Sequence, residues 1–189
     1  MARPRDWDAM ALKLPRTIRL DPSDTFVYSR AAEPGEWAVT GTFLFFGADI
    51  ENFSGKQRQA FRAGFLGIES FGWSTLAVVT EVTMEERNAA VECLAKQLVT
   101  RCGAPDIETA RPAAEEELSF AQSLCDHPVN TLLALHRSSE DGAIREAFRT
   151  LHRKVSRLEP ATAFRFVEVE EENEPAEEID ILALTGRRK

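Results

Sequence analysis

The sequence predicts an α+β fold: a single domain with a mixed, mostly antiparallel sheet and helices packed mainly on one of its faces. Its 189 residues match the size of one domain, and its apolar and charged shares, 43% and 29%, are typical of globular proteins. The expected elements follow the order ββαβααβαββ, which lacks the regular strand–helix alternation of a doubly wound sheet. We expect residues 14–185 to form the domain, between a flexible segment at 1–13 and a flexible tail at 186–189.

The first part of the chain is expected to form strands. Residues 17–20 and 25–28 are short runs typical of strands, and the sequence DPSD between them is typical of a turn. Residues 37–46 alternate well enough to predict a long strand antiparallel to the first. Gly41 within that strand is interpreted as a bulge.

A helix and a buried strand are expected next. Ser54 and Gln57 form a capping-box pattern, which predicts a helix that ends near Gly67. Residues 73–82 are rich in β-branched side chains and apolar on both faces, so they are expected to form a central strand.

The middle of the chain is expected to form two consecutive helices. Thr83 and Glu86 form a second capping box, and apolar residues follow at helical spacing until Gly103, a typical C-terminal stop. Pro112 is expected in the first turn of the next helix, which closes at 127–128.

The following segment is expected to contain a strand and an amphipathic helix. Residues 131–136 predict the strand. Ser138 and Asp141 are interpreted as the cap of a helix whose apolar face includes Ile144 and Phe148 and whose other faces are basic.

The C-terminal part is expected to complete the sheet. Residues 164–169 and 179–184 predict two strands of a long-looped hairpin. The acidic segment 170–178 between them lacks the order of calcium ligands found in an EF-hand, so it is interpreted as a solvated loop, with binding of a basic partner as the alternative.

Composition argues against several functional classes. The net charge of −8 opposes binding to nucleic acid, and no apolar run approaches the roughly 20 residues that span a bilayer, so neither nucleic acid nor membrane is an expected partner. Three cysteines without a CxxC pair argue against a disulfide framework and a thiolate zinc site, which favours a cytoplasmic location. We expect no metal, no cofactor and no catalytic residue set.

Two groups of residues are candidates for ligand binding. The first is Glu69, Ser70 and Trp73, which combine a carboxylate, a hydroxyl and an aromatic surface within a glycine-rich turn. The second is Arg145 and Arg149, which start a row of arginines with a spacing of four that could bind an anion. The alternative interpretations are a tightly packed connection for the first group and a solvated face for the second.

Cysteine and histidine residues give weaker indications. Cys125 and His127 are close in sequence, but neighbouring positions on a helix diverge, so a packed cysteine and a helix-terminal histidine are favoured over a catalytic pair. His136 is interpreted as a partly buried histidine rather than a metal ligand, because the three histidines lack the spacing of a metal-binding helix pair.

Three stretches together resemble a small uncharacterised bacterial family, a domain of unknown function. They are KLPRTIRLDPSD at 13–24, GFLGIESFGWST at 64–75 and DGAIREAFR at 141–149. The resemblance covers most of the chain after residue 12, and it implies a bacterial, intracellular setting but no activity, substrate or site residue.

The hypothesis that follows is a non-catalytic binding or accessory protein, which acts through contacts with a protein partner or through self-association. The alternative is a small-molecule-binding enzyme with a pocket between Glu69 and Trp73, in which a buried Glu69 would serve as general base.

Overall fold

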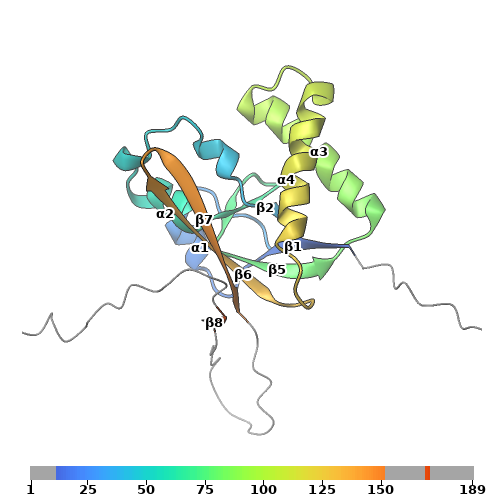
Figure 1. Ribbon diagram of the computed structural model, residues 1–189, viewed down its shortest axis with the longest axis horizontal. Helices are drawn as coiled ribbons and strands as arrows, with labels where there is room; N and C mark the ends of the chain where they lie inside the picture. The colour runs from blue at the N-terminus through green and yellow to red at the C-terminus, as the bar shows by residue number, and fades with distance from the viewer. Residues whose placement is uncertain (1–11, 152–168, 171–189) are drawn as a thin grey trace, which may run out of the picture.

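A computed structural model describes residues 12–151 and 169–170 of the chain, the last two by their backbone. They form a single α+β domain with two antiparallel sheets (Figure 1). The larger sheet has the order β1-β5-β6-β7-β8, in which the strands are β1 Lys13–Ile18, β5 Leu76–Glu81, β6 Leu132–Glu140, β7 Ala143–Leu151 and β8 Val169–Glu170. The smaller sheet has the order β2-β3-β4, with β2 Ala38–Val39, β3 Phe65–Gly67 and β4 Trp73–Ser74.

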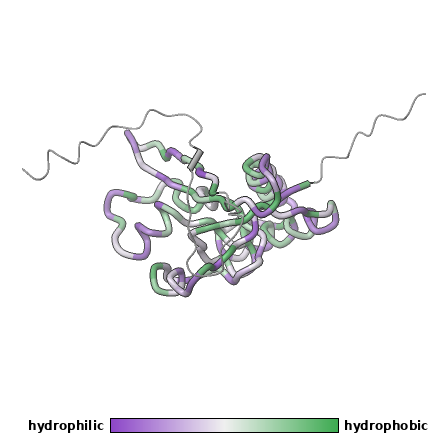
Figure 2. The backbone as a smooth tube through the Cα atoms, turned by 90° about the horizontal axis from the view of Figure 1, so that it is seen from below, coloured by the Kyte–Doolittle hydropathy of each residue, from purple (hydrophilic) through white to green (hydrophobic). Residues whose placement is uncertain are grey.

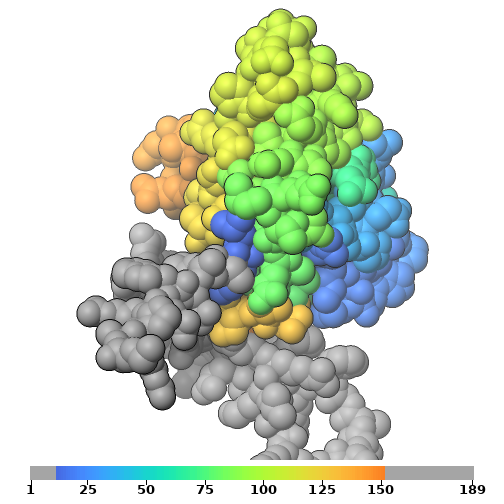
Figure 3. Space-filling model, turned by 90° about the vertical axis from the view of Figure 1, so that its right-hand side faces the viewer, coloured from blue at the N-terminus to red at the C-terminus, as the bar shows by residue number. Residues whose placement is uncertain are grey.

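The helices lie on the sheets in two groups. The α-helices are α1 Ser23–Val27, α2 Gly55–Ala63, α3 Met84–Cys102 and α4 Ile107–Ser123, and the short 3-10 helices are η1 Thr42–Phe45 and η2 Ile50–Asn52. Helices α3 and α4 pack on each other and make up most of one face of the molecule (Figure 3). Helix α2 lies at the opposite side, where it contacts β6, and α1 lies beside α2 (Figure 1).

The core consists of packed layers between these elements. Leu94 of α3 and Leu118 of α4 are fully buried against Leu14 of β1 and Leu66 of β3. Figure 2 shows that hydrophobic segments run through the middle of the molecule. The predicted α+β class and the mostly antiparallel pairing are thus confirmed.

Helices α3 and α4 show which local signals are reliable. The side chain of Thr83 accepts from the Glu86 amide and the Glu86 carboxylate accepts from the Thr83 amide, so the predicted capping box is present, and Gly103 ends α3 with a φ of 78°. Helix α4, however, begins at Ile107 because Asp106 accepts from the amide of Thr109 and caps it. Pro112 lies inside the helix, and the prediction that it occupies the first turn is wrong.

The strand predicted at 25–28 is also wrong, since Ser23–Val27 forms helix α1. The Asp21 carboxylate accepts from the amide of Ser23, and the Thr25 hydroxyl donates to the Pro22 carbonyl, so side chains stabilise a helical turn here. The buried carboxylate of Asp24 accepts from both the amide and the hydroxyl of Thr75, which fixes α1 to the sheet.

The long strand predicted at 37–46 is much shorter. Strand β2 covers only Ala38–Val39, with one further antiparallel bridge between Trp37 and Arg16, because Gly41 adopts a φ of 72° and turns the chain into η1. Gly41 is therefore the start of a 3-10 turn and not a bulge. This turn moves Phe45 away from the strand and into a cluster of aromatic rings with Phe61 and Trp73.

The predicted central strand is confirmed in β5, which pairs with β1 on one side and β6 on the other. Its first two residues belong instead to β4 of the smaller sheet, and the chain changes sheet at Thr75. The helix predicted from 54 is confirmed as α2, although it ends at Ala63 and Phe65–Gly67 continues as β3.

The amphipathic helix predicted after Ser138 does not form. Residues Leu132–Glu140 and Ala143–Leu151 pair as a long hairpin, joined by Asp141 and Gly142 with φ values of 50° and 78°. Two residues with positive φ form the type of turn that suits the twist of a tight hairpin. Of the C-terminal strands predicted at 164–169 and 179–184, only Val169 lies within the described residues, where it begins β8.

Candidate functional site

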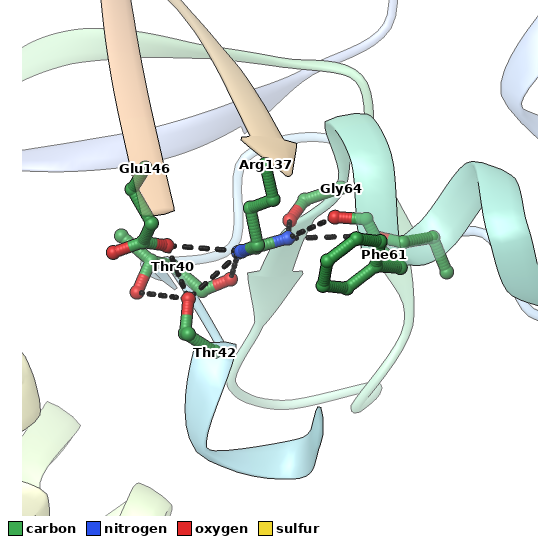
Figure 4. Close-up of polar contacts among 7 residues, drawn as sticks. Thr40, Thr42, Phe61, Gly64, Arg137 and Glu146 are labelled. Carbon is green, nitrogen blue, oxygen red and sulfur yellow. Dashed lines mark hydrogen bonds and ion pairs between the residues drawn. The ribbon is translucent and has the colours of Figure 1, made fainter. Parts of the chain in front are cut away.

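The largest fully buried side chain of the described residues is that of Arg137, on β6. Leu133, Leu135 and Arg137 alternate along the strand, so all three point to its buried side. A charged group in such a position must find several hydrogen-bond partners, because burying an unpaired charge is costly. Figure 4 shows that Arg137 finds them in segments from three parts of the chain.

The first partners are the carbonyl groups at the C-terminus of α2. The Nη1 group of Arg137 donates to the carbonyls of Phe61 and Gly64 at 2.9 and 3.0 Å, and to that of Ala60 at 3.4 Å. The last carbonyls of a helix have no partner within the helix and lie at the negative end of its dipole. Arg137 therefore caps α2 and joins it to the hairpin.

The second group of partners lies between β2 and η1 and on β7. The Nη2 group donates to the carbonyl of Thr40, and the Nε group donates to the hydroxyl of Thr42 at 2.8 Å and to the carboxylate of Glu146 at 2.9 Å. The hydroxyl of Thr42 in turn donates to Glu146. The side chains of Arg137 and Glu146 are 0% and 16% exposed, so this is a buried ion pair within a hydrogen-bond network.

A second carboxyl group lies close to this network. The pKa of Glu117, on α4, is raised to about 7, mainly by burial and also by the nearby charges of Glu146 and Glu116, while Arg137 acts in the opposite direction. The carboxyl group of Glu117 therefore changes its protonation state near neutral pH.

A cavity of about 310 Å³ opens beside Arg137, between η2, α2 and the end of β6. Its lining from η2 and α2 consists of Ile50, Glu51, Arg58, Phe61 and Arg62. Its lining from β6 consists of Arg137, Ser138 and Ser139. We call it the arginine cavity, because three of its described lining residues are arginines.

A second recess, of about 350 Å³, lies over the middle of the hairpin and is lined by Ala134, Leu135, His136 and Arg149. Burial lowers the pKa of His136, and the positive charges of Arg62 and Arg149 lower it further. The imidazole is consequently harder to protonate than that of an ordinary histidine.

The candidate residues Arg145 and Arg149 lie on β7 rather than on a helix. Their spacing of four is even, so both still lie on one face of the strand, and both are exposed. Arg145 forms an ion pair of 2.7 Å with Glu140, in which the two side chains are 64% and 54% exposed. Of these two arginines, only Arg149 lines one of the cavities described above, the recess over the middle of the hairpin.

The candidate residues Glu69, Ser70 and Trp73 lie around the turn between β3 and β4, and none of them lines either cavity. The Glu69 side chain is exposed, and the Ser70 hydroxyl accepts from the amide of Gly72 at 3.1 Å. Trp73 stacks on Phe45 with 5.4 Å between ring centroids. The side chains of Ser70 and Trp73 are thus held by contacts within the fold.

The buried carboxylate at this turn belongs to Glu36, which the sequence analysis did not single out. Glu36 is 5% exposed, and it accepts from the amides of Glu33, Glu69 and Ser70 at 2.6, 3.0 and 2.8 Å. A Cβ atom on Gly67 would lie 2.7 Å from its Oε2 atom, which explains the need for glycine there. Glu36 therefore determines the shape of the Glu69 turn.

The three cysteines differ in burial: Cys125 is buried, Cys93 is partly buried and Cys102 is exposed. Cys125 is 2% exposed within an apolar cluster, and burial raises the pKa of its thiol to about 12. Burial also raises the pKa of Cys93 and of Cys102. Within residues 12–151, no three histidine, cysteine or acidic side chains come together as metal ligands would.

Sequence reasoning missed Arg137, Glu146 and the two arginines of α2 that line the cavity. One signal could have indicated the first pair: Arg137 follows the apolar positions Leu133 and Leu135 at strand spacing, and the sequence Asp141-Gly142 is typical of a hairpin turn. A hairpin centred on that turn places Glu146 directly opposite Arg137.

The fold and this site define an antiparallel α+β domain organised around a buried arginine. The chain belongs to a family of unknown function, DUF6505, which matches residues 10–171. The resemblance to an uncharacterised family is therefore confirmed, and its bacterial setting stays a prediction. No curated protein matches the chain, and no solved structure matches it. Of the helices that the structure describes, none combines the length and the apolar character needed to cross a bilayer.

Proposed function

We propose that this protein is a non-catalytic binding protein that acts through contacts with a protein partner, and that it recognises an acidic region of that partner on the β6–β7 hairpin. The observation that carries the proposal is the position of His136, Arg145 and Arg149. The pairing of Ala134 with Arg149, His136 with Ala147 and Ser138 with Arg145 puts the three basic side chains on one face, which we call the basic hairpin face.

The basic hairpin face has the exposure that a contact surface requires. His136, Arg145, Ala147 and Arg149 are all exposed. Strand β5 pairs with β6 only as far as Ala134, so the hairpin extends beyond the neighbouring strand (Figure 1). The recess beside His136 gives this surface a shape into which a partner's side chain can fit.

Charge supports an acidic partner. The protein as a whole carries a net charge of −8, whereas this face presents the guanidinium groups of Arg145 and Arg149 at the surface. Guanidinium groups bind carboxylates through paired hydrogen bonds. The exposed ion pair of Arg145 with Glu140 contributes at most about 1 kcal/mol, so Arg145 can exchange Glu140 for a partner's carboxylate at little cost.

The alternative, a small-molecule-binding enzyme with a pocket between Glu69 and Trp73, stays a prediction. It requires a buried Glu69 as general base, whereas the Glu69 side chain is exposed and the buried carboxylate of that turn, Glu36, accepts three backbone hydrogen bonds. We therefore favour the binding role.

The test is native mass spectrometry of the protein purified gently from its own cells, as the original chain and as R145Q/R149Q. A control variant, K96Q/R101Q, removes the same charge from α3. We expect a partner chain, or a second copy, to stay bound to the original chain and to the control and to be lost from R145Q/R149Q. A complex that survives equally in all three proteins, or a strictly monomeric original chain, contradicts the proposal.

A further inference from the structure

We propose that the arginine cavity is a binding site for a small molecule with an oxyanion group, either phosphoryl or carboxylate, attached to a short apolar part. This site is additional to the basic hairpin face, and its described lining shares no residue with the recess on that face. The inference goes beyond the proposed function and does not depend on a protein partner.

Two guanidinium groups supply the charge for an oxyanion. The Nε group of Arg58 donates to the carbonyl of Phe53 at 2.8 Å, which holds this side chain at the cavity while its terminal nitrogens have no acceptor among the described residues. Arg62, one turn further along α2, forms no hydrogen bond or ion pair with any described residue. Both groups can therefore donate to a ligand.

The other charged groups of the cavity do not cancel the positive charges of Arg58 and Arg62. Arg137 is already balanced by Glu146, so this pair adds little net charge. Glu51 supplies the only carboxylate among the described lining residues, and it lies too far from Arg58 and Arg62 to form an ion pair with either. The cavity thus keeps an excess of positive charge in a protein whose net charge is −8.

Neutral donors and an apolar wall complete the site. Ser138 and Ser139 line the cavity from the end of β6, and neither hydroxyl has a hydrogen-bond partner among the described residues. Of the two, Ser139 shares the face of β6 that carries Arg137, whereas Ser138 shares the face that carries His136. Hydroxyl and guanidinium donors together match the several acceptor oxygens of a phosphoryl or carboxylate group. Phe61 and Ile50 provide apolar surface on the side of α2 and η2.

The size of the cavity limits the ligand. Its volume of about 310 Å³ is close to the lower end of the range of small-molecule sites. A single oxyanion with one ring or a short chain is therefore expected to fit, whereas a dinucleotide is not.

The experiment is a calorimetric titration of the purified full chain with phenyl phosphate and with phenylacetate, followed by amide NMR to locate the site. We expect at least one probe to bind with a Kd below about 10 mM and to shift the amides of Ser138, Ser139 and α2. Tighter binding of phenyl phosphate assigns a phosphoryl ligand, and tighter binding of phenylacetate assigns a carboxylate ligand.

Two variants make the result specific. R58Q/R62Q is expected to weaken binding at least about tenfold, and S138A/S139A to weaken it less, while K96Q/R101Q on α3 retains the original affinity. The proposal is overturned if neither probe binds or if R58Q/R62Q binds as well as the control. Because no partner protein is present in the titration, this outcome is distinct from a failure of the proposed function.

Discussion

Arg137 and Glu146 lie directly opposite each other across the β6–β7 hairpin, and their side chains meet at 2.9 Å on its buried face. The same guanidinium also binds the end of α2 and the segment that follows β2. One side chain thus connects three segments that are distant in sequence. Because the arginine cavity adjoins this point, the network also determines the position of its walls.

Replacement of Glu146 by alanine is expected to destabilise the protein by about 3 kcal/mol, since it leaves a buried guanidinium without its counter-charge. The carbonyl groups around Arg137 remain and limit the loss. The measurement is the free energy of unfolding in urea. The matched control is E140A, which removes the carboxylate of the exposed ion pair with Arg145 and should cost no more than about 1 kcal/mol. Equal losses in the two variants would show that the buried pair has no special role.

Replacement of Glu36 by alanine is expected to release the turn that contains Glu69 and Ser70. Three amides lose their acceptor, and an unsatisfied buried donor costs about 1–3 kcal/mol, so a total loss of at least about 2 kcal/mol is expected. Hydrogen exchange should become faster at the amides of Glu69 and Ser70. E33A, three residues earlier and exposed, keeps all three hydrogen bonds and serves as the control. Unchanged protection of these amides in E36A would contradict the assignment.

Local signals in the sequence were sufficient for some elements and not for others. The capping box of Thr83 and Glu86 depends only on residues within one turn, and it was predicted correctly. Ile144 and Phe148 are four apart, a spacing that places two residues on one face of a helix and equally on one face of a strand. The difference lies in Asp141, which the capping pattern assigns with Ser138 to a helix start, whereas in the structure it forms a hairpin turn with Gly142.

The candidate site illustrates the same limit. The even spacing of Arg145 and Arg149 kept them on one face although their element was predicted wrongly. The arginine cavity could not be predicted, because α2 and β6 come together through long-range contacts, which include the bonds of Arg137 to the end of the helix. Glu36 was missed because its partners Glu69 and Ser70 lie more than thirty residues away in the chain.

The raised pKa of Glu117 predicts a dependence of stability on pH. Its pKa rises from the usual 4.5 to about 7 on folding, so the folded state holds this proton more tightly than the unfolded state. The contribution of the group to stability is fully present below about pH 4.5 and is lost as the pH rises through about 7. The E117Q variant imitates the protonated form. Its free energy of unfolding, relative to that of the original chain, should therefore increase as the pH rises from 5 to 8.

The measurement for Glu117 is the difference in free energy of unfolding between variant and original chain at these two pH values. E81Q, at an exposed position at the end of β5, serves as the control and should show no such change, because the charge of Glu81 is not among those that raise the pKa of Glu117. A difference for E117Q that is the same at pH 5 and pH 8 would contradict the assignment.

Replacement of Gly41 by alanine tests the turn that separates β2 from η1. Its φ of 72° is strained for any residue with a side chain, and an added Cβ atom would lie 2.7 Å from the Cβ of Leu66 and 3.1 Å from the ring of Trp73. Gly35 has a similar φ of 89° but open space around it, so G35A isolates the cost of the backbone conformation, about 1–2 kcal/mol. G41A should cost about 1–3 kcal/mol more because buried atoms must move. The measurement is the free energy of unfolding of both variants, from thermal and urea unfolding. Equal losses in G41A and G35A would mean that Trp73 and Leu66 move aside without loss of stability. This result would contradict the tight packing of the turn.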